Sequence, residues 1–511
     1  MLLKFTDKQR RWLGFVSVVS CIALIFTDQS ILPVAIPTIQ RDFGATSFLS
    51  QWMINSYLLS MAVFILAAGR LSDIVGFRRI FLLGLTIFLF ASLFCAIALN
   101  SIWLITFRFI QGIGAAFMIP SSYNILLDLF PANRRGLIVG INTAVGSFFL
   151  SLAPYIGGLF TQYLSWRWVF WINIPICFIG QVFGILAIGK PDVSKEKFDF
   201  KGFFLFAISI ICIILAFMQA KNWGFTSPGI ILLFIFAIVF FWFFLVVTKK
   251  AKHPFLDFSL FKNKIFSVVS LVIFLELFAT GATIFWAIYF QYIWGFSPSK
   301  AGFAMLISAI PIIFMAPIGG MLMDKYSVKV PMVIGLFLTL FSFVWFISFF
   351  HTGSILILLP SLLTLGWGLT FSLTPAIAAG ITSVPNKTRG MATGIFGTLR
   401  NAGRSIGFAV AGAILLNVEH IFLSKDLKIN ESTKNLDPTT FDGLLAKAPK
   451  AIDAFNKLST SAQAIVKKAY FNATEKSFLI ANSVAAFLVL ISIVWVLIRC
   501  KKKKITCKSK N

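Results

Sequence analysis

Long apolar segments recur along the whole chain and alternate with short polar loops. Most are about 20 residues long, the length that an α-helix needs to cross the hydrocarbon core of a bilayer. They are continuously apolar rather than alternating, which favours helices over the strands of a membrane barrel. The expected spans, fourteen in all, are 12–36, 49–69, 80–99, 103–125, 137–160, 168–188, 203–220, 229–247, 266–293, 301–322, 331–350, 354–381, 392–422 and 477–498.

The composition supports this pattern. Of the 511 residues, 58% are hydrophobic and 12% are charged, whereas about a quarter of a soluble chain is charged. The first apolar segment has a basic flank, but no small-residue cleavage site follows it, so we expect an uncleaved first span. The sequence therefore predicts an all-α polytopic membrane protein.

The formal net charge of +27 is unevenly placed. Basic residues gather in alternate short loops, as the positive-inside rule describes for a cytoplasmic face. This placement favours contact with the lipid bilayer and argues against nucleic acid as a partner. It also predicts that both termini are cytoplasmic. The basic segments are 8–11, 78–79, 134–135, 190–201, 249–264, 325–329, 387–389 and 499–504.

Two stretches of the first half return in the second half. Residues 69–73 (GRLSD) recur as 320–324 (GMLMD), at an offset of 251. Residues 134–140 (RRGLIVG) recur as 388–394 (TRGMATG), at an offset of 254. Duplicated helical halves of parallel topology are typical of transporters that bind their substrate between the halves.

The repeat defines the expected domains. An N-terminal six-helix bundle would span 1–189, and a linker with two extra helices would span 190–262. A C-terminal six-helix bundle would occupy 263–498, followed by a basic cytoplasmic tail at 499–511. The second bundle contains a long polar outer loop, 424–476, with a helix-like portion. A solvated connector is the simpler interpretation of this loop, and a cap or a partner surface is the alternative.

Several motifs carry a family resemblance. The stretch GRLSDIVGFRR (69–79) resembles the signature loop of the major facilitator superfamily, and LITFRFIQGIGAA (104–116) is similar to its helix-four motif. The segment APYIGG (153–158) resembles its helix-five antiporter motif. Further stretches resemble the fourteen-helix drug:proton antiporters, namely 166–175, 198–202, 253–263 and 399–407.

The resemblance implies a major facilitator fold, with two six-helix bundles and two inserted helices. It also implies that the protein lies in the plasma membrane, the inner membrane of a bacterium. It implies a monomer that exports amphipathic drugs or toxic compounds in exchange for protons. A proton-coupled or facilitative carrier of one physiological solute, such as a metabolite or siderophore, is the alternative. No cofactor is expected, since no P-loop motif is present. The scattered cysteines and histidines predict neither a metal site nor an enzyme.

The resemblance also implies that the charged loop is a cytoplasmic gate, rather than a simple positive-inside turn. Gly69 and Gly76 would permit close helix approach and a tight turn. Asp73 can accept hydrogen bonds from a helix N-terminus or pair with an arginine. Arg78 and Arg79 would anchor the loop at the anionic inner leaflet.

The second copy of the loop keeps Gly320 and Asp324 but has Ser327 where the second glycine belongs. We therefore expect a second gate that is weaker than the first.

Asp28 and Arg108 are charged residues inside apolar spans. An ionised side chain at the bilayer centre costs about 2.5–3.5 kcal/mol on insertion scales, so both are functional candidates. The resemblance implies that Asp28 couples transport to protons and that Arg108 tunes or relays its protonation. The simpler alternatives are an Asp28 hydrogen-bonded to local hydroxyls and an Arg108 that extends to the headgroups.

Gly140, Pro154, Gly157 and Gly158 match the helix-five motif, which is associated with antiport. Small residues permit tight helix packing, and a proline bends the helix. The chain departs from the family pattern at Phe149, where a glycine is expected.

Glu276 is a second carboxylate deep in a span, outside any motif of the family. It could bind a cationic substrate or a proton, or serve only as a structural hydrogen-bond acceptor. Trp52, Tyr57, Trp286 and Tyr289 are candidates to line a substrate cavity, because aromatic rings bind lipophilic cations. Membrane-interface belts explain the same aromatic residues equally well.

Overall fold

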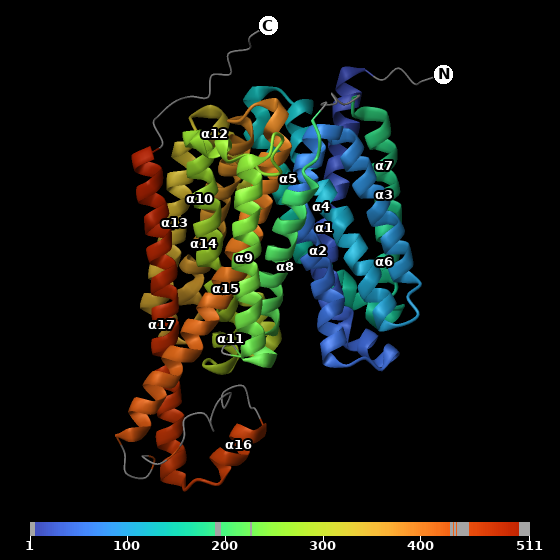
Figure 1. The fold of residues 1–511 in the computed structure, drawn as a ribbon. Helices are drawn as coiled ribbons and strands as arrows, with labels where there is room; N and C mark the ends of the chain where they lie inside the picture. The colour runs from blue at the N-terminus through green and yellow to red at the C-terminus, as the bar shows by residue number, and fades with distance from the viewer. Residues whose placement is uncertain are drawn as a thin grey trace.

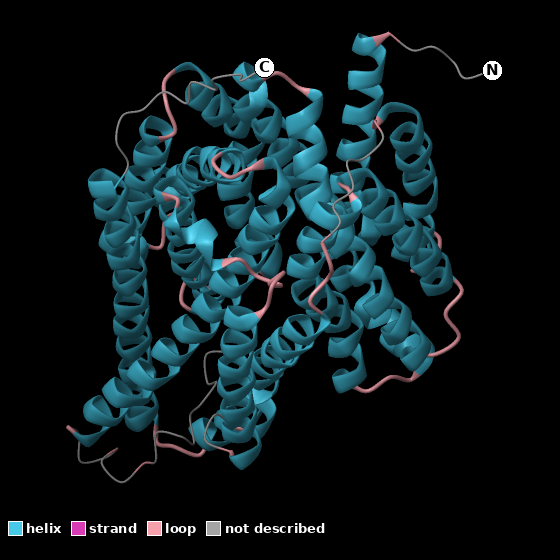
Figure 2. Ribbon diagram, turned by 45° about the horizontal axis from the view of Figure 1, so that its top comes forward, coloured by secondary structure: helices cyan, strands magenta, loops and turns pink. Residues whose placement is uncertain are grey.

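In the computed structural model, the regular secondary structure of the described residues consists of helices (Figure 2). The structure describes residues 6–189, 196–224, 227–429, 433, 436 and 449–499. Fourteen helical segments among them are long and apolar enough to cross a bilayer. The predicted all-α fold with fourteen spans is therefore confirmed. The expected basic tail lies outside the described residues, apart from Arg499.

The first half supplies six spans. They are α1 (Asp7–Phe43), α2 (Ser47–Val75), α3 (Phe77–Ala96), α4 (Ser101–Leu129), α5 (Arg135–Tyr163), and α6 (Trp168–Trp171) continued by α7 (Asn173–Ala187). Local chemistry fixes several of their ends. Thr6 and Gln9 form a reciprocal capping box at the start of α1. Gly76 has a φ of 100° between α2 and α3, a backbone conformation that favours glycine at this tight turn.

The second half repeats this order after two inserted helices, α8 (Phe200–Trp223) and α9 (Pro228–Lys250). Its first span is broken by a short 3₁₀ turn at Gly281–Thr283. The helices are α10 (Lys264–Thr280), α11 (Ile284–Tyr292), α12 (Pro298–Lys325), α13 (Lys329–Phe349), α14 (Ile355–Thr382), α15 (Arg389–Lys428), α16 (Pro449–Asn456) and α17 (Thr460–Arg499).

Figure 1 shows the two halves side by side, with α1–α7 on one side, α10–α17 on the other, and α8 and α9 in front. The start of α1 and the end of α17 lie at the same end of the molecule, which we call the terminal face. The opposite end carries an extension formed by α15, α16 and α17.

This extension is more ordered than the expected connector. The helices α15 and α17 continue beyond their apolar spans and pack on each other through Leu423, Leu427, Val466 and Tyr470. The described part of the loop therefore has a small apolar core of its own. Residues 430–432, 434–435 and 437–448 of the loop lie outside the described residues.

The two halves meet through two pairs of glycines. A Cβ on Gly69 of α2 would overlap the carbonyl oxygen of Gly390 on α15, and the reverse also holds. In the same way, a Cβ on Gly136 of α5 or on Gly320 of α12 would overlap the backbone of the other glycine. The sequence repeat relates these two contacts, since 320 repeats 69 and 390 repeats 136. Backbone-to-backbone packing therefore joins the halves at two equivalent places.

Two glycines of the helix-five motif allow a matched test of this packing. A Cβ on Gly140 would meet the backbone of residues 316–317 across the interface, with a Cα at 2.8 Å. A Cβ on Gly158 would meet only the Val34 side chain, at 3.9 Å. We expect Gly140→Ala to destabilise the protein by about 1–3 kcal/mol through overpacking, and Gly158→Ala to stabilise it slightly, by about 0.5–1 kcal/mol, because alanine is the better helix residue where a Cβ has room. Thermal unfolding of the purified variants measures the difference, and equal melting temperatures would contradict it.

Candidate functional site

Asp28 and Arg108 form a buried ion pair inside the first bundle. Nη1 of Arg108, on α4, donates a hydrogen bond to Oδ2 of Asp28, on α1. Asp28 is fully buried and Arg108 is 1% exposed. The structure therefore brings together the two charged residues that the sequence singled out.

Two amide side chains complete the environment of Asp28. Gln111 donates to Oδ1 of Asp28 at 3.0 Å and to Oγ of Ser92 at 2.9 Å. Asn173 donates to the same Oδ1 atom at 3.4 Å. Side chains of α4 and α7 therefore bind the carboxylate on α1, and Ser92 of α3 joins the cluster through Gln111. The hydroxyl groups close to Asp28 in the sequence do not bind its carboxylate. Ser30, for example, donates to backbone carbonyl oxygens instead.

Arg108 is held in place by further contacts. Its Nη1 also donates to Oε1 of Gln111 at 2.6 Å, and its Nε donates to the carbonyl oxygen of Met53 at 3.2 Å. The ring of Tyr57 lies 4.3 Å from the guanidinium carbon, within cation–π range. Arg108 therefore does not extend to the headgroups, and Tyr57 contacts this cluster.

Sequence reasoning missed Gln111, Ser92 and Asn173. Gln111 lies one helical turn after Arg108, in the span of α4, and is fully buried. A buried amide one turn from a buried arginine is a signal that the sequence does contain, because residues i and i+3 share a helix face.

Glu276 occupies a comparable place in the second bundle. It lies on α10, the repeat of α1, and its Oε1 accepts hydrogen bonds from Ser372 at 2.6 Å and Thr339 at 3.1 Å. These partners lie on α14 and α13, the repeats of α4 and α3. Its Oε2 has no hydrogen-bond partner among the described residues. Among the described residues, each bundle therefore has one fully buried carboxylate, and of these two, Asp28 is the one with an arginine beside it.

Two aspartates on the terminal face bind helix N-termini of the opposite half. Asp73, on α2, accepts hydrogen bonds from the backbone N–H groups of 390–391 at the start of α15, at 2.6 and 2.7 Å. Asp324, on α12, accepts from those of 136–137 at the start of α5, both at 2.9 Å. A carboxylate at a helix N-terminus is favourable because it satisfies free N–H groups and complements the helix dipole.

The arginines of the charged loop differ from one another. Arg78 donates a hydrogen bond to the carbonyl oxygen of Ile185 at 2.8 Å, and Arg79 is exposed. Arg70 is buried and forms an ion pair with Glu196 at 2.7 Å. Another ion pair, between Arg389 of α15 and Asp128 of α4 at 3.3 Å, joins the two halves.

A cavity of 170 Å³ lies between the halves. Helices α1, α4 and α5 line it from the first half, and α10, α12, α14 and α15 from the second. Its walls are mostly apolar, with a few polar side chains and two arginines, Arg400 and Arg404. A mostly apolar site with few polar groups is typical of small-molecule binding sites.

None of the five candidate substrate-binding residues lines this cavity. Trp286 and Tyr289 are buried within the second bundle, where Trp286 stacks on Phe346 and donates to Asn482 at 2.8 Å. Trp52 is half-buried, and Glu276 and Tyr57 have the contacts described above. The structure therefore assigns the walls of the cavity to other residues.

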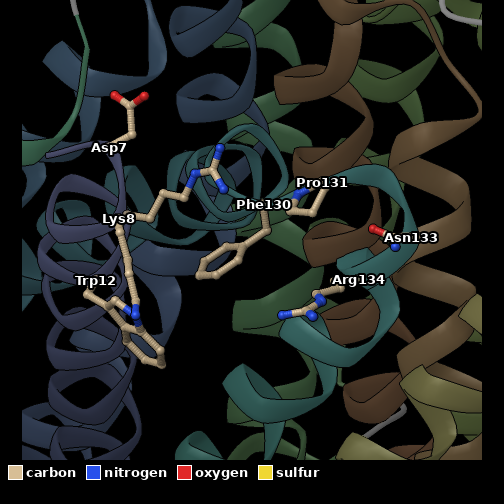
Figure 3. A pocket seen from close by; sticks show the side chains of 8 residues that line it. Asp7, Lys8, Trp12, Phe130, Pro131, Asn133 and Arg134 are labelled. Atoms are coloured by element: carbon tan, nitrogen blue, oxygen red, sulfur yellow. The ribbon is translucent and has the colours of Figure 1, made fainter.

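A larger hollow of 780 Å³ lies at the terminal face, next to the start of α1 (Figure 3). Its lining residues come from α1 and from the α4–α5 connection, and include Lys8, Arg11, Arg134 and Trp12. It lies at the ends of these helices rather than between the halves, so it is not the candidate substrate site.

A sequence profile of the Major Facilitator Superfamily matches residues 18–261 and 268–423. The multidrug resistance protein Stp of Mycobacterium tuberculosis is 31% identical over 406 residues, which cover 77% of this chain and 73% of Stp. The riboflavin transporter RibZ of Clostridioides difficile is 29% identical over 432 residues, 84% of this chain and 91% of RibZ.

The crystal structure of the human organic anion transporter MFSD10 superposes with a TM-score of 0.59. The match covers 96% of this chain and 100% of that chain, at 15% sequence identity. At this identity the likeness shows a shared fold and carries nothing about the substrate.

A double-mutant cycle tests the buried pair. Asp28→Asn and Arg108→Gln should each destabilise the protein by about 3–5 kcal/mol, because each leaves a buried polar or charged partner uncompensated. The double variant should be less destabilised than the sum of the two, since it buries no unpaired charge. Chemical unfolding in detergent measures all three free energies, and strict additivity would contradict the coupling.

Proposed function

This chain belongs to the Major Facilitator Superfamily of membrane transporters, and from that premise we propose that it exports amphipathic compounds in exchange for protons. Its family makes it a transporter and not an enzyme. The similarity to a multidrug resistance protein over most of both chains supports export of drugs or toxic compounds.

The buried Asp28–Arg108 pair is the observation that carries proton coupling. A proton and Arg108 compete for the same carboxylate, so protonation of Asp28 breaks the ion pair. Arg108 then keeps its contacts with Gln111, the Met53 carbonyl and the rings of Tyr57 and Phe170. Three helices, α1, α4 and α7, meet at Asp28, and α3 is linked to it through Gln111, so a change of charge there alters contacts between several helices of the first bundle.

The contacts of Asp73 and Asp324 support alternating access. We place the terminal face, and with it both termini, in the cytoplasm, in agreement with the basic loops. With both aspartates bound to helix N-termini of the opposite half, the cytoplasmic side is closed. Their release would let the halves separate there. Arg78 and Arg79 hold the loop near the membrane surface.

The helix-five motif contributes to the same interface. Gly140 packs on α12 across it, and Gly157 packs on Ile31 of α1 within the first bundle. Pro154 lies inside the helix. Because one chain supplies both halves and the cavity between them, the working unit is a monomer.

A second candidate is a carrier of one physiological solute. The similarity to the riboflavin transporter RibZ over 84% of this chain favours it. The two functions differ in how many unrelated compounds drive proton movement.

Proton flux in proteoliposomes tests the proposal. With a pH gradient imposed, we expect several unrelated amphipathic compounds to trigger proton movement in the wild type, and Asp28→Asn to abolish it. Glu276→Gln is the matched control, since it makes the same carboxyl-to-amide change in the other bundle, and it should retain the flux.

Undiminished flux in Asp28→Asn would remove this carboxylate from the mechanism. Loss of flux in Glu276→Gln alone would move the coupling site to the second bundle. A response to one compound only would favour the single-solute carrier.

A further inference from the structure

The two arginines of the central cavity lie well inside α15, where Arg400 is half-buried and Arg404 is exposed. Arg400 and Arg404 come 11 and 15 residues after Arg389, the first residue of α15. At 1.5 Å per residue, these positions are about 16 and 22 Å along the helix. Residues four apart share one helix face, and both side chains line the cavity. Two positive charges therefore lie together near the middle of the membrane-spanning region.

Neither guanidinium has an anionic partner. Among the described residues, no carboxylate lines the cavity, and no ion pair or hydrogen bond involves either arginine. The guanidinium carbon of Arg400 lies 5.6 Å from the centre of an aromatic ring, that of Phe26 on α1. The gate aspartates are not available to them, because Asp73 and Asp324 bind backbone N–H groups. Charged residues at this depth are costly and mark functional sites.

Neutral polar groups of the cavity are also unpartnered. Within the described part of the chain, both amide atoms of Asn142, on α5, lack a hydrogen-bond partner, although the residue is only 1% exposed. Oγ1 of Thr374, on α14, is likewise buried and unpartnered. Buried polar groups are normally hydrogen-bonded, so unpartnered ones that line a cavity point to a ligand or water in it. They lie on both halves and could bind one molecule from two sides.

Most of the remaining wall is apolar, with Ile119, Leu150, Ile273, Leu277, Leu373 and Phe396 among its residues, and the rest carries neutral hydroxyl groups such as those of Thr143, Ser147 and Thr370. A ligand that fits must therefore have an apolar body and a group that accepts hydrogen bonds from guanidinium. The cavity volume of 170 Å³ is below the range of about 300–1,000 Å³ for drug-sized sites. This conformation therefore accommodates a small ligand or must widen for a larger one.

We propose that this cavity binds an amphipathic organic anion, with a carboxylate, sulfonate or similar group on Arg400 and Arg404. This inference rests on the proposed function in taking the central cavity as the transport site. An anionic substrate takes the place of the lipophilic cation that the sequence suggested, because two adjacent arginines would repel a cation. Arginine suits the role because its planar guanidinium binds carboxylate and sulfonate oxygens in pairs.

The charge of the substrate has a consequence for the driving force. Export of a monovalent anion in exchange for one proton transfers two net positive charges into the cell. Export of a monovalent cation in exchange for one proton transfers none. An inside-negative membrane potential acts on transferred charge, so it should accelerate export of the anion.

Binding of matched dyes tests the proposal in the purified full-length protein. Fluorescein and rhodamine 123 share an aromatic skeleton and carry opposite charges at neutral pH. We expect saturable binding of fluorescein by anisotropy, displaced by 2-naphthalenesulfonate and not by rhodamine 123. Arg400→Gln and Arg404→Gln should each weaken fluorescein binding by about tenfold or more. Arg404→Lys should weaken it less than Arg404→Gln does, because the charge remains although the paired hydrogen bonds of the guanidinium are lost.

Lys425→Gln is the control, since it removes an exposed positive charge farther along the same helix. It should leave fluorescein binding unchanged. The dye competition in the wild type keeps the test valid even if an arginine variant fails to fold.

Failure of both anions to bind saturably, or unchanged binding in both glutamine variants, would overturn the anion site. Asp28-dependent proton flux driven by rhodamine 123 and not by fluorescein would overturn it as well, while supporting the proposed export function. Arginine-dependent anion binding without anion-driven proton flux would support the anion site and contradict proton-coupled export.

Discussion

The architecture depends on how closely two helices of one half approach two helices of the other. At the pairs Gly69–Gly390 and Gly136–Gly320, backbone packs directly on backbone. This approach places the start of α15 beside Asp73 and the start of α5 beside Asp324. Each aspartate then satisfies N–H groups that a helix start otherwise leaves free. Larger side chains at these glycines would separate the halves and break both sets of hydrogen bonds.

The charged groups near the membrane centre are divided between two places. Asp28 and Arg108 neutralise each other within the first bundle, away from the cavity, whereas Arg400 and Arg404 face the cavity and have no anionic partner among the residues that the structure describes. A proton at Asp28 and an anion in the cavity would therefore not compete for the same atoms. Their coupling must pass through helix packing, and α1 is suited to this because Phe26 lines the cavity two residues before Asp28.

The sequence was sufficient to predict the helices, their number and the repeat, because apolar segments of membrane-spanning length are a strong signal. It also identified Asp28 and Arg108, since charges inside such segments are rare. The spacing of Gln111 from Arg108 was a signal for one of their partners, but the sequence could not identify Asn173, because that contact depends on how α7 packs against α1. The residues that line the cavity could not be predicted either, because they too depend on how the helices rotate and pack. Aromatic residues such as Trp286 proved to be packed inside a bundle, while Arg400 and Arg404 face the space between the halves.

The separation of the two halves at the terminal face is the most direct test of this account. Spin labels would be attached at positions 133 and 387 after Cys500 and Cys507 are replaced. Asn133 and Lys387 are exposed residues at equivalent positions of the repeat. Pulsed electron paramagnetic resonance would then report the distance between the two labels. The account predicts a short distance in the wild type and a shift to longer distances in Asp73→Ala/Asp324→Ala. Identical distance distributions in the two proteins would contradict the claim that these aspartates hold the halves together.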